Sequence, residues 1–348
     1  MIPAAPAPQG GYPALTLDIM HQFHPDLALI ARLLPRFSFG PRLSRLARRL
    51  TRDAGPPRST PGVRASLRDI PGARTARVFV PDRATQPMPA MLWIHGGGFV
   101  MGSPAQDDAL ATMFARELGM TVVAPSYRLA PEHPFPAAMD DLYTALRWLH
   151  ANAEALNVRA DQLVVAGGSA GGGLAAGLTL LARDRKEIPV AFQLLVYPML
   201  DDRTVNRTLD GAHHRLWTAD SNRFGWTSYL GREPGGADVP AYAAPARAES
   251  LAGLPPTWIG VGTFDLFHDE DVAYAERLEA AGIPVELEIV PGVFHAFDGL
   301  RHTGVAKAFR ARQVAALRRA LACRREVWSR LGVGVGNGIG NGGGGGVR

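Results

Sequence analysis

Residues 162–173 of the chain read QLVVAGGSAGGG, an apolar run that leads into five glycines placed around one serine. Leu163 to Ala166 predict a buried strand, and the uncharged residues after Gly171 predict a buried helix. Gly167 and Gly171 permit a sharp turn between the two elements, which brings the hydroxyl of Ser169 into the open. The pattern indicates a nucleophilic serine; the structural alternative is a glycine-rich helix start with an incidental serine.

The chain on both sides of this stretch alternates between apolar and amphipathic runs. The apolar runs predict strands at residues 77–80, 91–95, 121–124, 162–166, 192–197, 257–261 and 284–290. Helical spacing of apolar residues predicts helices at 107–118, 137–152 and 305–322. Strands that alternate with helices favour an α/β fold with a mostly parallel, doubly wound sheet.

Three segments depart from this alternation and suggest the domain organisation. Residues 1–65 are rich in proline and arginine and form a predicted N-terminal cap segment before a catalytic domain at 66–330. Residues 202–254 form a predicted cap insertion, whose aromatic residues either line an apolar pocket or pack within the cap: Trp217, Phe224, Trp226 and Tyr229. Residues 331–348 are glycine-rich, which predicts a disordered tail.

Composition excludes several classes of protein. The chain has 348 residues, of which 47% are hydrophobic and 20% charged, so it is not wholly disordered, collagen-like or a coiled coil. Cys323 is its single cysteine, which excludes an intramolecular disulfide and a cysteine-rich metal site. The first twenty residues lack the features of a secretory signal, and the uncharged stretch 163–182 contains six glycines. The expected protein is soluble and cytoplasmic, without stable membrane insertion.

The positive charge does not indicate a nucleic-acid partner. The net charge is +5, but 35 of the 37 basic residues are arginine, which indicates compositional bias. The densest basic run, residues 42–52, has leucines at 43, 46 and 50. This spacing predicts an amphipathic helix with a solvated basic face.

The sequence His95-Gly96-Gly97-Gly98 follows a predicted strand and suits an oxyanion hole. Backbone N–H groups of such a loop can point at a developing negative charge, and residues without Cβ allow a close approach. The alternative is an ordinary glycine turn. Because this loop and the serine turn each follow a strand, we expect both at one edge of the sheet.

An acid and a histidine are expected after the serine, in that order. Asp265 lies in the loop after the strand 257–261, whereas its rival Asp269 lies where a helix begins and is expected to cap it. His295 follows the last strand at the same edge of the sheet. His268 is expected to be exposed on the helix start, and His95 to orient the glycine loop.

Together these motifs resemble the hormone-sensitive-lipase-like branch of the α/β hydrolases, which includes many carboxylesterases. The resemblance covers residues 76–297 and includes YRLAPE at 127–132, YPMLD at 197–201 and FH at 294–295. It implies Ser169 as nucleophile, Asp265 and His295 as its partners, and oxyanion donors from the N–H groups of Gly96, Gly97 and Ala170. It also implies that the N-terminal segment and the insertion form a cap over the pocket.

Three residues depart from the family pattern. Gly168 stands where the family has Asp or Thr, Gly173 where Asn is common, and Ala296 where Gly follows the histidine. Glycine adds backbone freedom and removes a side-chain hydrogen bond, so the first two departures are expected to loosen the turn.

The resulting hypothesis is hydrolysis of short- to medium-chain or aryl esters through an acyl-enzyme, without a cofactor or metal. A histidine base must be neutral, so activity is expected to fall as the pH drops through roughly 6 to 7. An amidase or formamidase on the same scaffold and a non-catalytic small-molecule receptor are the alternatives. A prolyl-oligopeptidase-like peptidase would need a propeller domain that 65 residues cannot build. An exposed sheet edge suggests a possible homodimer.

Overall fold

The computed structural model describes residues 22–36, 38–51, 55–82, 86–208 and 210–330. At its centre is an eight-stranded sheet with the order β1-β2-β4-β3-β5-β6-β7-β8. Its strands are β1 (Val63–Asp69), β2 (Thr75–Pro81), β3 (Met88–Ile94), β4 (Thr121–Pro125), β5 (Val158–Gly168), β6 (Phe192–Val196), β7 (Thr257–Phe264) and β8 (Val285–Phe294). Strands β3 to β8 are parallel, while β2 pairs antiparallel with both β1 and β4. The predicted α/β fold with a mostly parallel sheet is confirmed.

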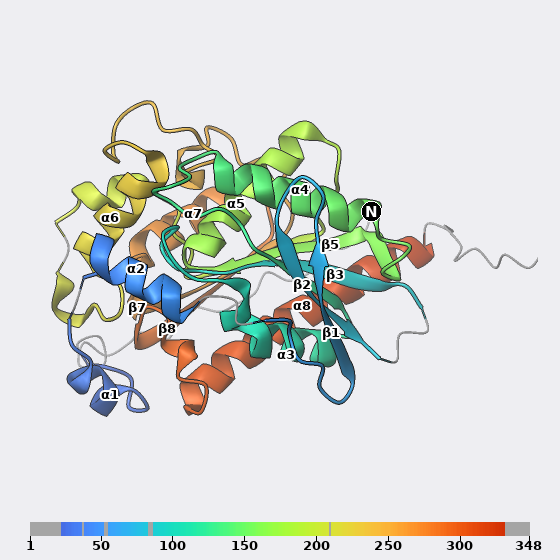
Figure 1. The fold of residues 1–348 in the computed structure, drawn as a ribbon, viewed down its shortest axis with the longest axis horizontal. Helices are drawn as coiled ribbons and strands as arrows, with labels where there is room; N and C mark the ends of the chain where they lie inside the picture. The colour runs from blue at the N-terminus through green and yellow to red at the C-terminus, as the bar shows by residue number, and fades with distance from the viewer. Residues whose placement is uncertain (1–21, 37, 52–54, 83–85, 209, 331–348) are drawn as a thin grey trace, which may run out of the picture.

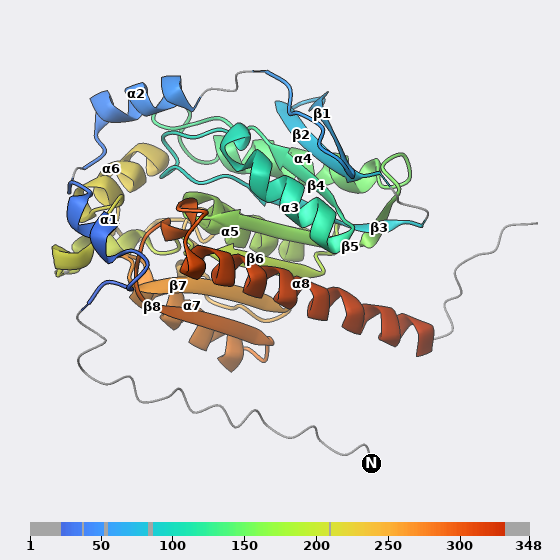
Figure 2. The same cartoon turned by 90° about the horizontal axis from the view of Figure 1, so that it is seen from below.

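Helices cover both faces of the sheet (Figure 1, Figure 2). One face packs against α3 (Asp108–Leu118) and α8 (Gly304–Arg330), and the other against α4 (Ala137–Ala151), α5 (Ala170–Arg185) and α7 (His268–Ala280). Burial on both faces explains why central strands such as β3 are apolar along their whole length. The uncharged stretch 163–182 forms the end of β5, the turn at Ser169 and the buried helix α5, as predicted.

Three further helices gather at one end of the molecule, beyond the carboxyl ends of the parallel strands (Figure 1, Figure 2). They are α1 (Ala28–Leu33), α2 (Pro41–Leu50) and α6 (Ala219–Leu230). The N-terminal segment contacts the start of α6, where Ser38 Oγ lies 2.8 Å from Thr218 Oγ1 and the Phe39 N–H donates to Ser221 Oγ at 2.8 Å. Residues 1–21 and 331–348, which belong to the predicted N-terminal segment and tail, lie outside the described residues.

The helix predicted at 42–52 forms, but the prediction that its basic face is solvated is wrong for Arg48. In α2, Leu46 and Leu50 are 50% and 79% exposed, while Arg48 turns inward. The Arg48 guanidinium donates to the carbonyl oxygens of Val100 and Ala130 and pairs with Glu132. These directional bonds of Arg48 fix the rotation of the helix about its axis. The two leucines are left on its exposed side.

β1 is a strand that the sequence analysis did not predict. It starts at Val63, inside the predicted N-terminal segment, and pairs along its whole length with β2. Its sequence VRASLRD has few apolar residues because an edge strand exposes much of its surface. In the part of the chain that the structure describes, no helix is both long enough and apolar enough to cross a membrane.

Candidate active site

Ser169 lies at the turn between β5 and α5, with a positive φ of 58°. Left-handed backbone is costly for a residue other than glycine, and here the surrounding chain holds it in place. The Ser169 N–H donates to the Val196 carbonyl at 2.9 Å, and its own carbonyl accepts the Met199 N–H at 3.0 Å. The serine is therefore fixed between the ends of β5 and β6, and it is 7% exposed.

The glycines around Ser169 differ in whether a Cβ would fit at their position. A Cβ on Gly167 would lie 2.3 Å from the Gly171 carbonyl oxygen, and one on Gly171 would lie 2.1 Å from that of Ile94. Gly173 has the same constraint against the backbone of Met199. At Gly168, in contrast, the nearest atom to a Cβ would be Tyr197 Cε2 at 3.7 Å. Close packing thus requires glycine at 167, 171 and 173, whereas position 168 has room for a methyl group.

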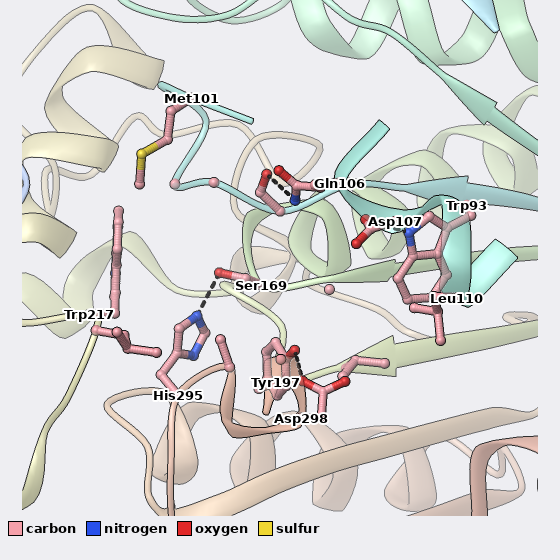
Figure 3. Close-up of a pocket in the computed structure, with 18 of the residues that line it drawn as sticks. Trp93, Met101, Gln106, Asp107, Leu110, Ser169, Tyr197, Trp217, His295 and Asp298 are labelled. Atoms are coloured by element: carbon pink, nitrogen blue, oxygen red, sulfur yellow. Dashed lines mark hydrogen bonds between the residues drawn. The ribbon is translucent and has the colours of Figure 1, made fainter. Parts of the chain in front are cut away.

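His295 and Asp265 reach Ser169 from the ends of two neighbouring strands, β8 and β7. His295 Nε2 lies 2.9 Å from Ser169 Oγ, and His295 Nδ1 lies 2.8 Å from Asp265 Oδ2 (Figure 3 shows the first contact). Since a carboxylate only accepts, Nδ1 carries the proton and Nε2 is left to accept one from the serine. The structure therefore brings together the three side chains that the sequence analysis singled out.

The surroundings of Asp265 and Asp269 distinguish the two candidates. Asp265 is 4% exposed, and its second oxygen accepts the Phe267 N–H at 3.0 Å. The Asp269 side chain is 68% exposed and contacts His268 at 2.9 Å. Asp269 is not brought to Ser169, and neither is His268.

Aromatic rings hold the His295 imidazole in place. Tyr197 and Phe267 contact it edge to face, with ring centroids 4.8 and 5.2 Å away. The next residue, Ala296, has a φ of 56°, so the departure from the family's glycine puts a Cβ into left-handed backbone. Such a residue costs roughly 1–2 kcal/mol.

The loop His95–Gly98 runs beside Ser169. A Cβ on Gly96 would lie 2.8 Å from the Gly168 carbonyl oxygen and 3.2 Å from Ser169 Cβ, so only glycine lets this loop approach the serine. Gly97 has a φ of 129° and would collide with the Met101 carbonyl, and a Cβ on Gly98 would overlap the Trp217 ring. Gly96 thus passes the serine at close range, and Ala170 follows the serine at the N-terminus of α5.

His95 is a part of this loop and not a second base. Burial lowers the pKa of His95 to about 4, so its ring is neutral near pH 7. Its Nδ1 donates to the Gly96 carbonyl at 2.9 Å, and its ring stacks on Tyr127 with centroids 4.3 Å apart. The Tyr127 hydroxyl donates in turn to the His95 carbonyl at 2.8 Å. These contacts fix the His95 ring against the glycine loop.

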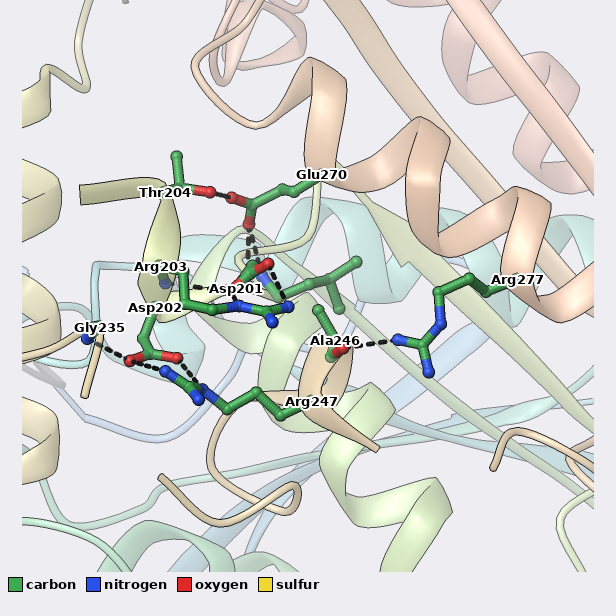
Figure 4. A network of polar contacts seen from close by, with 10 residues as sticks. Asp201, Asp202, Arg203, Thr204, Gly235, Ala246, Arg247, Glu270 and Arg277 are labelled. Carbon is green, nitrogen blue, oxygen red and sulfur yellow. Dashed lines mark hydrogen bonds and ion pairs between the residues drawn. The ribbon is translucent and has the colours of Figure 1, made fainter. Parts of the chain in front are cut away.

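A network of buried polar contacts supports the end of β6 from the side of α7 (Figure 4). Glu270 accepts the N–H groups of Leu200 and Asp201 at 2.7 and 3.2 Å and also the hydroxyl of Thr204. Burial raises the pKa of Glu270 to about 8, so the acid is favoured in its neutral form at pH 7. Beside it, Asp202 is fully buried and pairs with Arg247. The sequence analysis did not single out Glu270, whose position at a helix start gives no sign of its burial.

A cavity of about 390 Å³ opens beside Ser169 and His295. On one side, here called the apolar side, it is lined by Met101 and Trp217, with Phe39 beside the Trp217 ring (Figure 3). On the other it reaches Asp107 and Asp298 (Figure 3), which the sequence analysis did not single out. Of the four cap aromatics, Trp217 lines the cavity, whereas Trp226 and Tyr229 are buried against Phe99. Among the described residues, no group of three or more His, Cys, Asp or Glu side chains is arranged to hold a metal ion.

A serine at a strand-to-helix turn, with an aspartate and a histidine after two later strands of one parallel sheet, defines the α/β-hydrolase class. Comparison with known proteins agrees: a family profile described as alpha/beta hydrolase fold matches residues 91–299. The chain belongs to this family, in its hormone-sensitive-lipase-like branch, which confirms the resemblance.

Similar proteins carry esterase names. Carboxylesterase NlhH of Mycobacterium tuberculosis is 36% identical over 263 residues, which cover 73% of this chain and 80% of that protein. An ethyl acetate hydrolase of Pseudomonas putida is 38% identical over 60% of this chain and 65% of its own length. A solved bacterial heroin esterase is 38% identical, with a TM-score of 0.78 over 87% of this chain and 99% of the other.

Proposed function

We propose that the chain is a carboxylic ester hydrolase that works through an acyl-enzyme on Ser169. The observation that carries this proposal is the pair of contacts on His295, 2.9 Å from the serine hydroxyl and 2.8 Å from Asp265. A serine hydroxyl is a weak nucleophile at neutral pH and needs a base, and the base needs an orienting acid. The names of the similar proteins, carboxylesterase, ethyl acetate hydrolase and heroin esterase, support the ester as substrate.

The proposed reaction has two halves. His295 Nε2 takes the Ser169 proton as Oγ attacks the ester carbonyl, and the imidazolium that forms is stabilised by Asp265. The proton then passes to the leaving alcohol, and the acyl group stays on Ser169. Water, deprotonated by the same histidine, releases the acid in the second half.

The negative charge on the carbonyl oxygen needs donors in both halves of the reaction. The proposed donors are the backbone N–H groups of Gly96, Gly97 and Ala170. Support comes from the close approach of Gly96 to Ser169, which a side chain would block, and from the position of Ala170 at a helix N-terminus.

The segment up to residue 65 and the insertion at 202–254 are proposed to act together as the cap of the pocket. Phe39 and Trp217, one from each segment, both line the cavity, and their ring centroids are 6.0 Å apart. A cavity of about 390 Å³ accommodates a small ligand. We therefore propose short- to medium-chain or aryl esters as substrates.

Hydrolysis of a series of p-nitrophenyl esters, from acetate to palmitate, tests this function beside Ser169→Ala. Turnover of the short esters, lost in Ser169→Ala, is the expected result. Equal rates on the longest chains would contradict the proposed substrate range. Folded wild-type protein that cleaves none of the esters would contradict the function itself and favour an amide substrate or a receptor.

A further inference from the structure

The side of the cavity opposite Trp217 carries charged groups, with the Trp93 ring and Leu110 beside them. We call it the polar arm, and its charged and amide residues are Asp107, Asp298, Arg301, Arg310 and Gln313. Asp107 ends the short helix before α3, and Arg310 and Gln313 belong to α8, so the polar arm lies between these two helices. Figure 3 places Trp217 and Met101 on one side of Ser169 and Asp107 on the other. A substrate held at Ser169 thus meets two different environments.

The two carboxylates of the polar arm differ in how many protein groups they contact. Asp298 accepts the Tyr197 hydroxyl at 2.6 Å and has Arg310 at 3.7 Å. Within the described residues, the Asp107 side chain accepts one hydrogen bond, from Trp93 Nε1 at 2.8 Å. Its carboxylate is directed into the cavity (Figure 3). Asp107 therefore keeps acceptor capacity on the surface that a substrate would touch.

Two hydrogen-bond donors that line the same cavity lack a hydrogen bond as well. Gln313 is 1% exposed, and its Nε2 has no hydrogen-bond partner among the described residues. Arg310 Nε makes no hydrogen bond there either, although it forms an ion pair with Asp298 Oδ2 at 3.7 Å. A buried polar group without a partner is costly, so this end of the cavity is suited to a polar occupant.

A hydrocarbon chain is a poor occupant for this arm. It would strip water from Asp107 and return no hydrogen bond, which costs more than burial of a few methylene groups gains. The arm's two carboxylates and two guanidinium groups balance in charge, which disfavours a charged group of either sign. A hydroxyl group carries no charge and both donates and accepts, so it matches the polar arm.

We propose that the polar arm binds a hydroxyl group carried by the substrate ester, and that Asp107 selects it. This assignment rests on the proposed function, since it concerns the substrate of the same serine. Plain alkyl chains are then confined to the apolar side of the cavity. The preferred substrates are hydroxylated esters, with the hydroxyl group on the acyl or the alcohol portion.

Matched ester pairs test the assignment because each pair exchanges a hydroxyl for a methyl group. p-Nitrophenyl 6-hydroxyhexanoate against the heptanoate places the hydroxyl on the acyl side, and 2-hydroxyethyl butyrate against propyl butyrate places it on the alcohol side. We expect kcat/KM to favour the hydroxylated member about tenfold in at least one pair. Asp107→Leu should bring the ratio of kcat/KM within that pair to about one, whereas Asp69→Asn, at an exposed position of β1, should retain the wild-type ratio.

Each outcome bears on one proposal only. If Asp107→Leu does not fold, Asp107→Asn still accepts the Trp93 N–H and should show a reduced preference. Ratios near one in both pairs for wild type, or an Asp107 variant that keeps the full ratio, would overturn the assignment. So would a stronger preference for an ammonium or carboxylate group at the same position. Absence of turnover on every ester would instead contradict the proposed function.

Discussion

Two buried carboxylates near the start of α7, those of Asp265 and Glu270, differ in the kind of group that they bind. Asp265 is 4% exposed and shares its oxygens between the His295 ring and the Phe267 N–H. Glu270 is 3% exposed, and its oxygens accept two backbone N–H groups and a threonine hydroxyl. The first has a partner that can change its protonation state, and the second has only partners that cannot. Asp265 can therefore stabilise a charge that forms on its partner, whereas Glu270 holds backbone and hydroxyl groups in place.

The two acids are nevertheless connected through the backbone. Glu270 holds the N–H groups of Leu200 and Asp201, and the preceding Met199 N–H donates to the Ser169 carbonyl. The network in Figure 4 therefore fixes the strand end against which the serine turn rests. We expect mutations at Asp265 to affect rate and mutations at Glu270 to affect stability.

The largest effect is expected from Asp265→Asn. The amide still accepts the Phe267 N–H but no longer favours the His295 tautomer that leaves Nε2 free, so kcat should fall by about 10⁴ with little change in Tm. Steady-state kinetics and thermal unfolding measure the two quantities. Asp269→Asn is the matched control, and a comparable loss of kcat in that variant would reverse the assignment of the acid.

Glu270→Ala should show the opposite pattern. It leaves two buried N–H groups and a hydroxyl without their acceptor, which we expect to lower the free energy of unfolding by about 3 kcal/mol. The kcat of the protein that remains folded should stay within severalfold of wild type. Denaturant titration and active-site-normalised kinetics separate the effects; a large drop in kcat at unchanged stability would refute the distinction.

A pH dependence of stability sharpens the same comparison. Burial raises the pKa of Glu270 to about 8, above its usual value near 4.5. Between these values the unfolded chain releases a proton that the folded chain keeps, so the free energy of unfolding should decline as the pH rises from about 5 to 8.

Glu270→Gln is expected to reduce this slope, because glutamine has no proton to lose and preserves the acceptor oxygen. Burial also raises the pKa of Asp271, so part of the slope should remain. Denaturant titrations at several pH values measure it. A variant with the wild-type slope would show that Glu270 is ionised in the folded protein.

The smallest predicted effect is that of Gly168→Ala, and its neighbour Gly167 provides the contrast. Gly168→Ala has room for its methyl group and should stabilise the protein by about 0.4–1 kcal/mol, because it restricts the unfolded chain. Gly167→Ala would place Cβ 2.3 Å from the Gly171 carbonyl oxygen and should be strongly destabilising. Equal changes in Tm for the two variants would argue against the described turn.

The sequence predicts the meeting of Ser169, Asp265 and His295 because each follows a parallel strand, and the carboxyl ends of such strands share one edge. The polar arm could not be predicted in this way. Asp107 and Gln313 are more than 200 residues apart and meet only because α3 and α8 pack on the same face of the sheet. No periodicity or local motif encodes that packing.

The rotation of α2 escaped prediction for a related reason. Helical spacing placed its leucines inward, yet Leu50 is 79% exposed because Arg48 bonds to backbone carbonyls beside the glycine loop. Hydrophobic patterning gives no weight to such long-range bonds. The fold class follows from local pattern, whereas the walls of the pocket depend on contacts between distant segments.

The central claim is that Ser169 forms a covalent intermediate with the help of His295. Intact-mass analysis after reaction with diethyl p-nitrophenyl phosphate, followed by peptide mapping, tests it most directly. The account predicts one diethylphosphoryl group on the peptide that contains Ser169, no labelling of Ser169→Ala, and much slower labelling of His295→Ala. A label on another residue, or equal labelling of Ser169→Ala, would contradict it.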